Sequence, residues 1–318
     1  MLRLVEWARN PAVRRIFNLV SIGFFLVAGA LVARHFALSG WPIKHANPAL
    51  LSLAAGLFVV SYGFKAFGWQ RLFQQGARPR VLTLAAAGGA AAVGGIALPG
   101  RIDEVIRIAI VRKGNTASIA SIALTLFVLG LIDTVALSPL ASVAAAFVTV
   151  DTLFRAALGV VAFCGIGAAF VVVALPRFAS VKRLQRFRIV HWLAEHATCP
   201  VEAAKAAAFV AVSWTLRAVA TFVLLHALGV TGSFALALAF LCAGAASAVL
   251  PVAPAGAATQ AGAGAAILIA SGVPASEALA FAIASQALVI ASGAVFVLLF
   301  GGQLAGARIR LARAATHA

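Results

Sequence analysis

Long apolar runs alternate along this chain with short polar segments in which lysine and arginine predominate. Each run is close to the ~20 apolar residues that a helix needs to cross a bilayer. The eight runs cover about residues 16–38, 48–67, 81–98, 117–138, 153–175, 203–228, 234–250 and 275–300. This pattern predicts an all-α polytopic membrane protein, with a single transmembrane domain over residues 1–318.

The composition agrees with this class. Hydrophobic residues make up 63% of the chain and charged residues 10%, with a mean hydropathy of +1.06, whereas a soluble domain needs more charge to cover its surface. The net charge of +17 does not indicate nucleic acid, because the basic residues lie in clusters between apolar runs. Such clusters are typical of cytoplasmic loops that face anionic headgroups, so we expect membrane lipids as partners and no nucleic acid.

The basic clusters also test whether every run crosses the membrane. The N-terminal tail and residues 65–80 are basic and are therefore expected in the cytoplasm. If all eight runs crossed, the strongly basic segment 177–205 would lie outside, against the positive-inside rule. The conflict disappears if the third and seventh runs are re-entrant hairpins. We therefore expect six full spans and two hairpins entered from opposite sides, with both termini in the cytoplasm.

Proline and glycine mark the places where the hairpins would break. The first hairpin would end at residues 112–113, and the second would resume as the apolar stretch 261–270. Proline frees backbone carbonyls, which must then line a cavity rather than lipid. The alternative is that these prolines only kink helices that cross fully. The expected hinge residues are Pro99, Gly100, Pro251, Pro254, Gly256 and Gly262.

The order span, span, hairpin, span occurs twice, and the second set starts from the opposite side of the membrane. Both hairpins run from an Ala/Gly-rich helix through Leu-Pro into a polar turn. This order predicts an inverted repeat with halves of about residues 12–150 and 151–305. The broken segments of such repeats meet near the bilayer midplane in many transporters.

The first broken segment carries the strongest candidate chemistry. Helical spacing places Arg101, Glu104 and Arg107 on one ridge. Charges within a bilayer are costly unless they are paired or hydrated, so such a ridge indicates a functional site. Arginine grips a phosphate bidentately, and Glu104 would order the two guanidinium groups. The alternative is a structural cap at the headgroup level, with the arginines extended toward water.

Three further polar residues lie at membrane depth. Gln260 follows the second break, where the N–H groups at a helix N-terminus could face an anion; it could equally hold two helices together. Arg217 and Asp133 are single charges within apolar runs, which could contact substrate, carry a proton or pair with each other. Lys65, with the neighbouring tryptophan and arginine, has the composition of an interfacial anchor.

Enzymatic motifs are poorly represented. His191, Glu195 and His196 have the wrong spacing for a zinc-binding helix and lie in a basic segment. The sequence has no G-x-S-x-G motif and no acidic cluster suited to Mg²⁺ and a nucleotide. We therefore expect no catalytic residue, no metal site and no cofactor.

Both broken segments resemble those of the lysylphosphatidylglycerol synthase transmembrane family, also called the flippase-like domain family. The residues that match its first segment are Leu98, Pro99, Gly100, Arg101, Glu104 and Arg107, with Asp103 in place of a glycine. Those that match its second segment are Leu250, Pro251, Pro254, Gln260 and Gly262, with Ala255 in place of a glycine. Asp133 matches the family's intramembrane aspartate, whereas Leu129 and Gly130 stand where the family often has Glu-Arg.

The resemblance implies a stand-alone flippase-like protein of the bacterial inner membrane, without the soluble aminoacyltransferase domain of the bifunctional members. The leading hypothesis is a lipid translocase that moves a polar or anionic phospholipid through a central polar cavity. One alternative is a membrane partner that presents lipid to a separate lipid-biosynthetic enzyme. A second alternative is an intramembrane lipid-modifying enzyme, which Glu104 keeps open.

Overall fold

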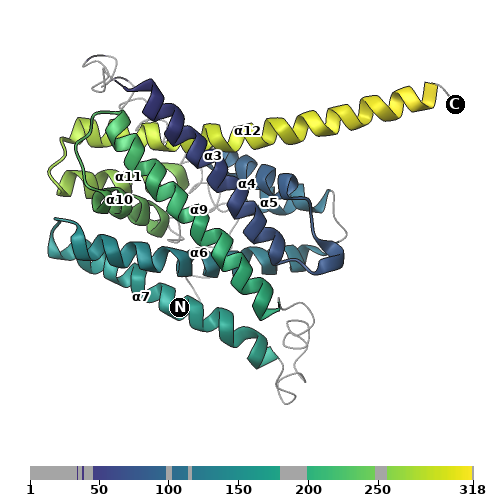
Figure 1. Cartoon of the computed structure of the whole chain (residues 1–318), viewed down its shortest axis with the longest axis horizontal. Coiled ribbons are helices and arrows are strands. Elements are labelled where there is room, and N and C mark those ends of the chain that lie inside the picture. The colour runs from purple at the N-terminus through teal and green to yellow at the C-terminus, as the bar shows by residue number, and fades with distance from the viewer. Residues whose placement is uncertain are drawn as a thin grey trace, which may run out of the picture.

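The computed structural model describes residues 46–97, 102–113, 117–179, 199–247 and 256–316, together with residues 34 and 38. Over these ranges the chain is all-α, with one short 3-10 turn, and the helices pack into a bundle (Figure 1). The elements are α3 (Pro48–Arg71), η1 (Gln75–Ala77), α4 (Val81–Ala97), α5 (Ile102–Arg112), α6 (Ile119–Phe147), α7 (Thr152–Ala179), α9 (Pro200–Ala227), α10 (Phe234–Ser247), α11 (Gly256–Ala270) and α12 (Ala275–Thr316).

Five of these helices are long and apolar enough to cross a membrane: α3, α6, α7, α9 and α12. Shorter apolar helices occupy residues 81–94, 234–247 and 259–270. The chain is therefore a multi-pass membrane protein, as the hydropathy pattern predicts. The first apolar run, residues 16–38, lies almost entirely outside the described residues.

Side chains that cap the first turn determine where α3 and α6 begin. Asn47 caps α3, because its Oδ1 accepts hydrogen bonds from the N–H groups of Ala49 and Leu50 at 3.0 and 3.3 Å. Pro48 then occupies the first helical position, where a missing N–H costs nothing. In the same way, the Ser118 hydroxyl accepts from the N–H of Ser121 and begins α6.

The antiparallel pair α3 and α9 forms the centre of the bundle (Figure 1). At one end the N–H of Asn47 donates to the carbonyl of Ala227 at 2.8 Å. At the other end the Glu202 carboxylate contacts Arg78 at 2.7 Å and Arg71 at 3.5 Å. These contacts fix the start of each helix beside the end of the other.

Two pairs of shorter helices occupy the segments in which the sequence predicts hairpins. Helix α4 packs on α5, and α10 packs on α11. Helix α5 ends at Arg112, as expected, whereas α11 begins at Gly256, earlier than the stretch 261–270. The expected hinge residues Pro99, Gly100, Pro251 and Pro254 lie outside the described residues. Gly262 lies within α11.

Candidate functional site

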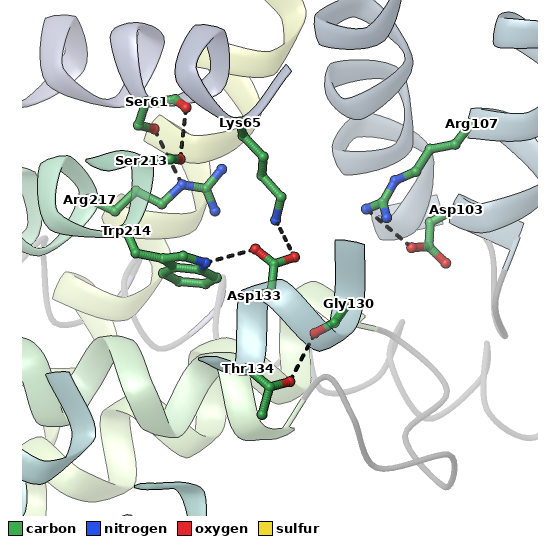
Figure 2. A network of polar contacts seen from close by, with 10 residues as sticks. All are labelled: Ser61, Lys65, Asp103, Arg107, Gly130, Asp133, Thr134, Ser213, Trp214 and Arg217. Carbon is green, nitrogen blue, oxygen red and sulfur yellow. Dashed lines mark hydrogen bonds and ion pairs between the residues drawn. The ribbon is translucent and has the colours of Figure 1, made fainter. Parts of the chain in front are cut away.

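A network of polar side chains joins α3, α6 and α9 (Figure 2). At its centre is Asp133 of α6. One carboxylate oxygen of Asp133 lies 2.8 Å from Lys65 Nζ on α3. The other accepts a hydrogen bond from Trp214 Nε1 of α9, also at 2.8 Å. Both oxygens of the Asp133 carboxylate are thus engaged by neighbouring helices.

Arg217 of α9 lies beside this pair and is held differently. Its Nε donates to the Ser61 hydroxyl at 3.3 Å. Its guanidinium carbon lies 5.0 Å from the centroid of the Tyr62 ring and 5.2 Å from that of Trp214. Such cation–π contacts stabilise a cation only modestly. Within the described part of the chain, Arg217 has no ion pair with a carboxylate.

The network follows from helical spacing. Ser61, Tyr62 and Lys65 lie on one stripe of α3, because they are three and four residues apart. Ser213, Trp214 and Arg217 form the same kind of stripe on α9, and the antiparallel packing places the two stripes face to face. The Ser213 hydroxyl donates to the Ser61 carbonyl at 2.8 Å, and Lys65 Nζ lies 5.4 Å from the Trp214 ring.

These two stripes repeat one sequence pattern. Residues 60–66 read VSYGFKA, and residues 212–218 read VSWTLRA. Each contains serine, an aromatic residue and, three positions further, a cation. Each cation also lies over the aromatic ring of the other helix. Sequence reasoning missed Ser61, Tyr62 and Trp214, and this repeated pattern is the signal that would have found them.

Arg107 of α5 extends toward this network from the opposite side (Figure 2). Its guanidinium lies 3.5 Å from the Asp103 carboxylate, one helical turn away. The buried Nε of Arg107 has no hydrogen-bond partner among the described residues. Arg107 therefore retains donor capacity beside the network.

The network remains partly accessible although it lies within membrane-spanning helices. The side chains of Lys65 and Asp133 are 25% and 20% exposed, and that of Arg107 is 32% exposed. Charged groups at membrane depth almost always face a bundle interior or a hydrated cavity and mark ligand or ion pathways. These residues can thus meet a polar ligand without leaving their helices.

Only some of the site residues predicted from the sequence belong to the network. Asp133 and Arg217 both belong to the network, but Asp133 pairs with Lys65 rather than with Arg217. Lys65 is therefore part of the network and not the interfacial anchor that its neighbours suggest. Glu104 is half-buried on α5. Arg101, the first residue of the expected ridge, lies outside the described residues.

Gln260 occupies a different place from the network. It is half-buried in α11, and its backbone lies against α10, where a Cβ added at Gly244 would be 3.4 Å from the Gln260 carbonyl oxygen. None of the hydrogen bonds or ion pairs between described residues joins Gln260 to Asp133 or Arg217. Over the same residues, no group of three His, Cys, Asp or Glu side chains is placed to hold a metal ion.

Comparison with known proteins gives one match. The family described as lysylphosphatidylglycerol synthase TM region matches residues 18–301, which is most of the chain. Neither the curated proteins nor the solved structures contain a match to this chain.

Proposed function

We propose that this chain, which belongs to the lysylphosphatidylglycerol synthase transmembrane family, moves a polar or anionic phospholipid across the bacterial inner membrane. The observation that carries the proposal is the network at Asp133. It brings lysine and arginine from separate helices together at membrane depth, and Arg217 has no carboxylate partner among the described residues. A cation at membrane depth raises the free energy of the folded protein by several kcal/mol unless an anion or water compensates its charge.

The pairing at Glu202 supports the hairpin topology. Because Glu202 contacts Arg71 and Arg78, the end of α3 and the start of α9 lie on the same side of the membrane. If the apolar runs 81–98, 117–138 and 153–175 all crossed, three crossings would separate these ends and place them on opposite sides. A re-entrant pair of α4 and α5 leaves two crossings, α6 and α7. The positive-inside rule then assigns this basic side to the cytoplasm.

Helix packing supports an inverted repeat. The contacts of α3 with α4, α4 with α5 and α5 with α6 have counterparts in α9 with α10, α10 with α11 and α11 with α12. Across the halves, α4 packs on α12 as α10 packs on α6, and α6 packs on α9 as α12 packs on α3. Antiparallel α3 and α9 would then face each other across a twofold axis in the membrane plane, as in many secondary transporters.

This arrangement suggests how a headgroup would cross. The phosphate would bind Arg107 and Arg217 in turn, while the acyl chains stay in the surrounding lipid. Arg101 and Glu104 would extend the same path along the first hairpin. Movement of one half against the other would expose the network to each side alternately. The sequence has no nucleotide-binding motif, so transport would be coupled to a gradient or uncoupled.

Transport by the purified protein tests the proposal. Vesicles containing the protein and a labelled phosphatidylglycerol would be treated with a membrane-impermeant reductant that destroys the label on the outer leaflet. Since a hydrogen bond to a charged group contributes about 1.5–3 kcal/mol, Arg107→Gln and Arg217→Gln should each slow exchange about tenfold or more.

Arg80→Gln is the matched control, because Arg80 is an exposed arginine in the segment before α4. It should exchange lipid at the wild-type rate. Unchanged exchange in both Arg107→Gln and Arg217→Gln would remove these residues from the path. Absence of exchange in the wild type, together with co-purification of a lipid-biosynthetic enzyme, would favour the lipid-presenting role.

A further inference from the structure

Basic side chains surround a single carboxylate where the end of α3 meets the start of α9. Lys205 Nζ lies 2.9 Å from Glu202 Oε1, and Arg78 Nη2 lies 2.7 Å from Oε2 of the same residue. Arg71 Nη1 approaches that Oε2 as well, at 3.5 Å. We call these four residues the Glu202 cluster. Because Arg71 follows Lys65 by six residues, or about 9 Å along α3, the cluster is separate from the Asp133 network.

Arg71 is held less tightly than the other cations of the Glu202 cluster. Arg78 and Lys205 each donate a hydrogen bond to the Glu202 carboxylate, and together they engage both of its oxygens. Arg78 Nε also donates to the Phe73 carbonyl at 3.3 Å. Among the described residues, Arg71 has only its ion pair at 3.5 Å, and its buried Nε has no partner. Since a guanidinium group has five N–H donors, Arg71 retains donors that an anion can engage.

The cations of the Glu202 cluster are more exposed than its carboxylate. The Glu202 side chain is 17% exposed, whereas those of Arg71 and Lys205 are 33% and 52% exposed. Three cations and one carboxylate make the cluster net positive over the described residues. The neighbouring sequence does not reverse this sign, because segment 177–198 has Glu195 as its single acidic residue among several basic ones. The cluster therefore presents positive charge and N–H donors to an incoming anion.

We propose that Arg71, Arg78 and Lys205 form a binding site for a phosphate group at the membrane surface. Arginine binds phosphate oxygens through paired N–H groups, and lysine adds a point charge. The three cations belong to α3, to the segment before α4 and to α9, so they approach a ligand from different directions. This arrangement suits the tetrahedral oxygens of a phosphate better than a planar carboxylate. A lipid headgroup and free phosphate share this chemistry at the end of a spanning helix.

The bound phosphate would join equivalent elements of the two halves. Arg71 belongs to α3 and Lys205 to α9, the helices that carry the repeated pattern of residues 60–66 and 212–218. A ligand that contacts both helices adds an interaction between them and stabilises their packed arrangement. The site lies outside the proposed lipid path, and the inference stands whether or not the protein transports lipid.

Ligand binding to the purified protein in phosphate-free detergent solution tests the proposal. Phosphatidic acid and diacylglycerol with the same acyl chains differ only in the phosphate group, and native mass spectrometry would count each of them on the protein. Inorganic phosphate would be titrated by calorimetry and as a competitor of the lipid. The wild type should bind phosphatidic acid at least about tenfold more tightly than diacylglycerol. Saturation with phosphatidic acid should also raise the Tm, because the ligand binds the folded state.

Two variants in the cluster and one control isolate the site. Arg71→Gln should weaken the binding of phosphatidic acid about tenfold or more, and should leave the Tm without lipid close to that of the wild type, because no hydrogen bond is lost. A purely structural arginine would show the opposite pattern. Lys205→Gln should weaken binding about threefold or more. Arg112→Gln changes the same charge at an exposed arginine that ends α5, and should bind as the wild type does. Lipid bound at the Asp133 network is common to these proteins and cancels in the comparison.

Equal affinity for phosphatidic acid and diacylglycerol, together with no binding of inorganic phosphate, would overturn the proposal. So would wild-type binding in both Arg71→Gln and Lys205→Gln. Displacement of the lipid by inorganic phosphate at similar concentrations would support the site and assign it to free phosphate, whereas resistance to displacement would assign it to a lipid headgroup. If Arg71→Gln does not fold, Lys205→Gln decides, because its side chain is half exposed. Lipid exchange in vesicles is a separate measurement, whose absence would contradict the proposed function and leave this site standing.

Discussion

The Asp133 carboxylate holds three helices together through two contacts. Lys65 brings α3 to it, and Trp214 brings α9. A lysine within a spanning helix depends on such a partner, because an unpaired charge there must be hydrated or else raises the energy of the folded state. The pair therefore has a structural role in addition to its place in the proposed lipid path.

Removal of the Asp133 charge should destabilise the protein. In Asp133→Asn, Lys65 loses its ion pair but keeps part of its exposure, so we expect the free energy of unfolding to fall by about 2–3 kcal/mol. The loss would be measured as a lower Tm of the purified protein in detergent. A Lys65→Met, Asp133→Leu double variant should regain most of it, because well-packed apolar residues can replace a buried pair. A double variant as unstable as Asp133→Asn would contradict this account.

At the scale of single residues, the sequence predicts which charged side chains belong to the site better than it predicts which side chains they contact. Asp133 and Arg217 were recognised because charges are conspicuous within apolar runs. Their partners were not, because the position of Lys65 near the end of a span, beside tryptophan and arginine, has the composition of an interfacial anchor. Only the packing of α3 against α6 and α9 decides that this lysine contacts Asp133.

The contact between α3 and α9 depends on Gly68. A Cβ added there would lie 2.8 Å from Val210 Cγ2 and 3.1 Å from the Ala206 carbonyl oxygen. Gly63 lies on the same helix and has nothing within 4 Å of the equivalent position. The two glycines thus differ in their surroundings while sharing a helical backbone, which makes them a matched pair.

Alanine substitution should separate these two glycines. Gly68→Ala should destabilise the protein by about 1–3 kcal/mol, because the backbone of α9 must move to admit the methyl group. Gly63→Ala should leave the stability unchanged or raise it by up to about 1 kcal/mol, since alanine favours the helix. Thermal unfolding of both variants checks this. Equal Tm values would show that α3 and α9 do not approach closely at Gly68.

Hydropathy predicted the helices better than their ends. Helix α4 spans Val81–Ala97 and matches the run 81–98 closely. Helix α6 continues to Phe147 and α12 to Thr316, well past their apolar runs. Hydropathy reports the thickness of the bilayer, whereas a helix ends where its backbone hydrogen bonds end. The start of α11 at Gly256 was missed because its first turn is small and weakly apolar.

For the whole molecule, the hairpin topology is tested by finding which side of the membrane each loop faces. In a background without Cys164, Cys199 and Cys242, single cysteines would replace Arg80, Lys113 and Asp151, which are all exposed. A membrane-impermeant thiol reagent added to intact cells should label Asp151→Cys alone. Arg80→Cys and Lys113→Cys should react only after the membrane is opened. Labelling of Lys113→Cys from outside would mean that the first hairpin crosses fully.

The class of the whole molecule could be predicted from the sequence, and its arrangement could be predicted only in part. The all-α membrane class and the family were both correct, because apolar composition and the segments around Leu98 and Leu250 are local signals. The packing of α3 against α9 could not be predicted, because the residues that meet there lie about half the chain apart.

Helix α12 has a practical consequence for imaging. It continues without interruption over 42 residues, and its C-terminal part projects beyond the bundle (Figure 1). At a rise of about 1.5 Å per residue, this rod is about twice as long as the hydrocarbon core is thick. A helical protein fused in register after Thr316 would therefore turn with the bundle as one body. For a chain of only 32.4 kDa, such a fusion would provide the added mass that alignment in electron microscopy needs.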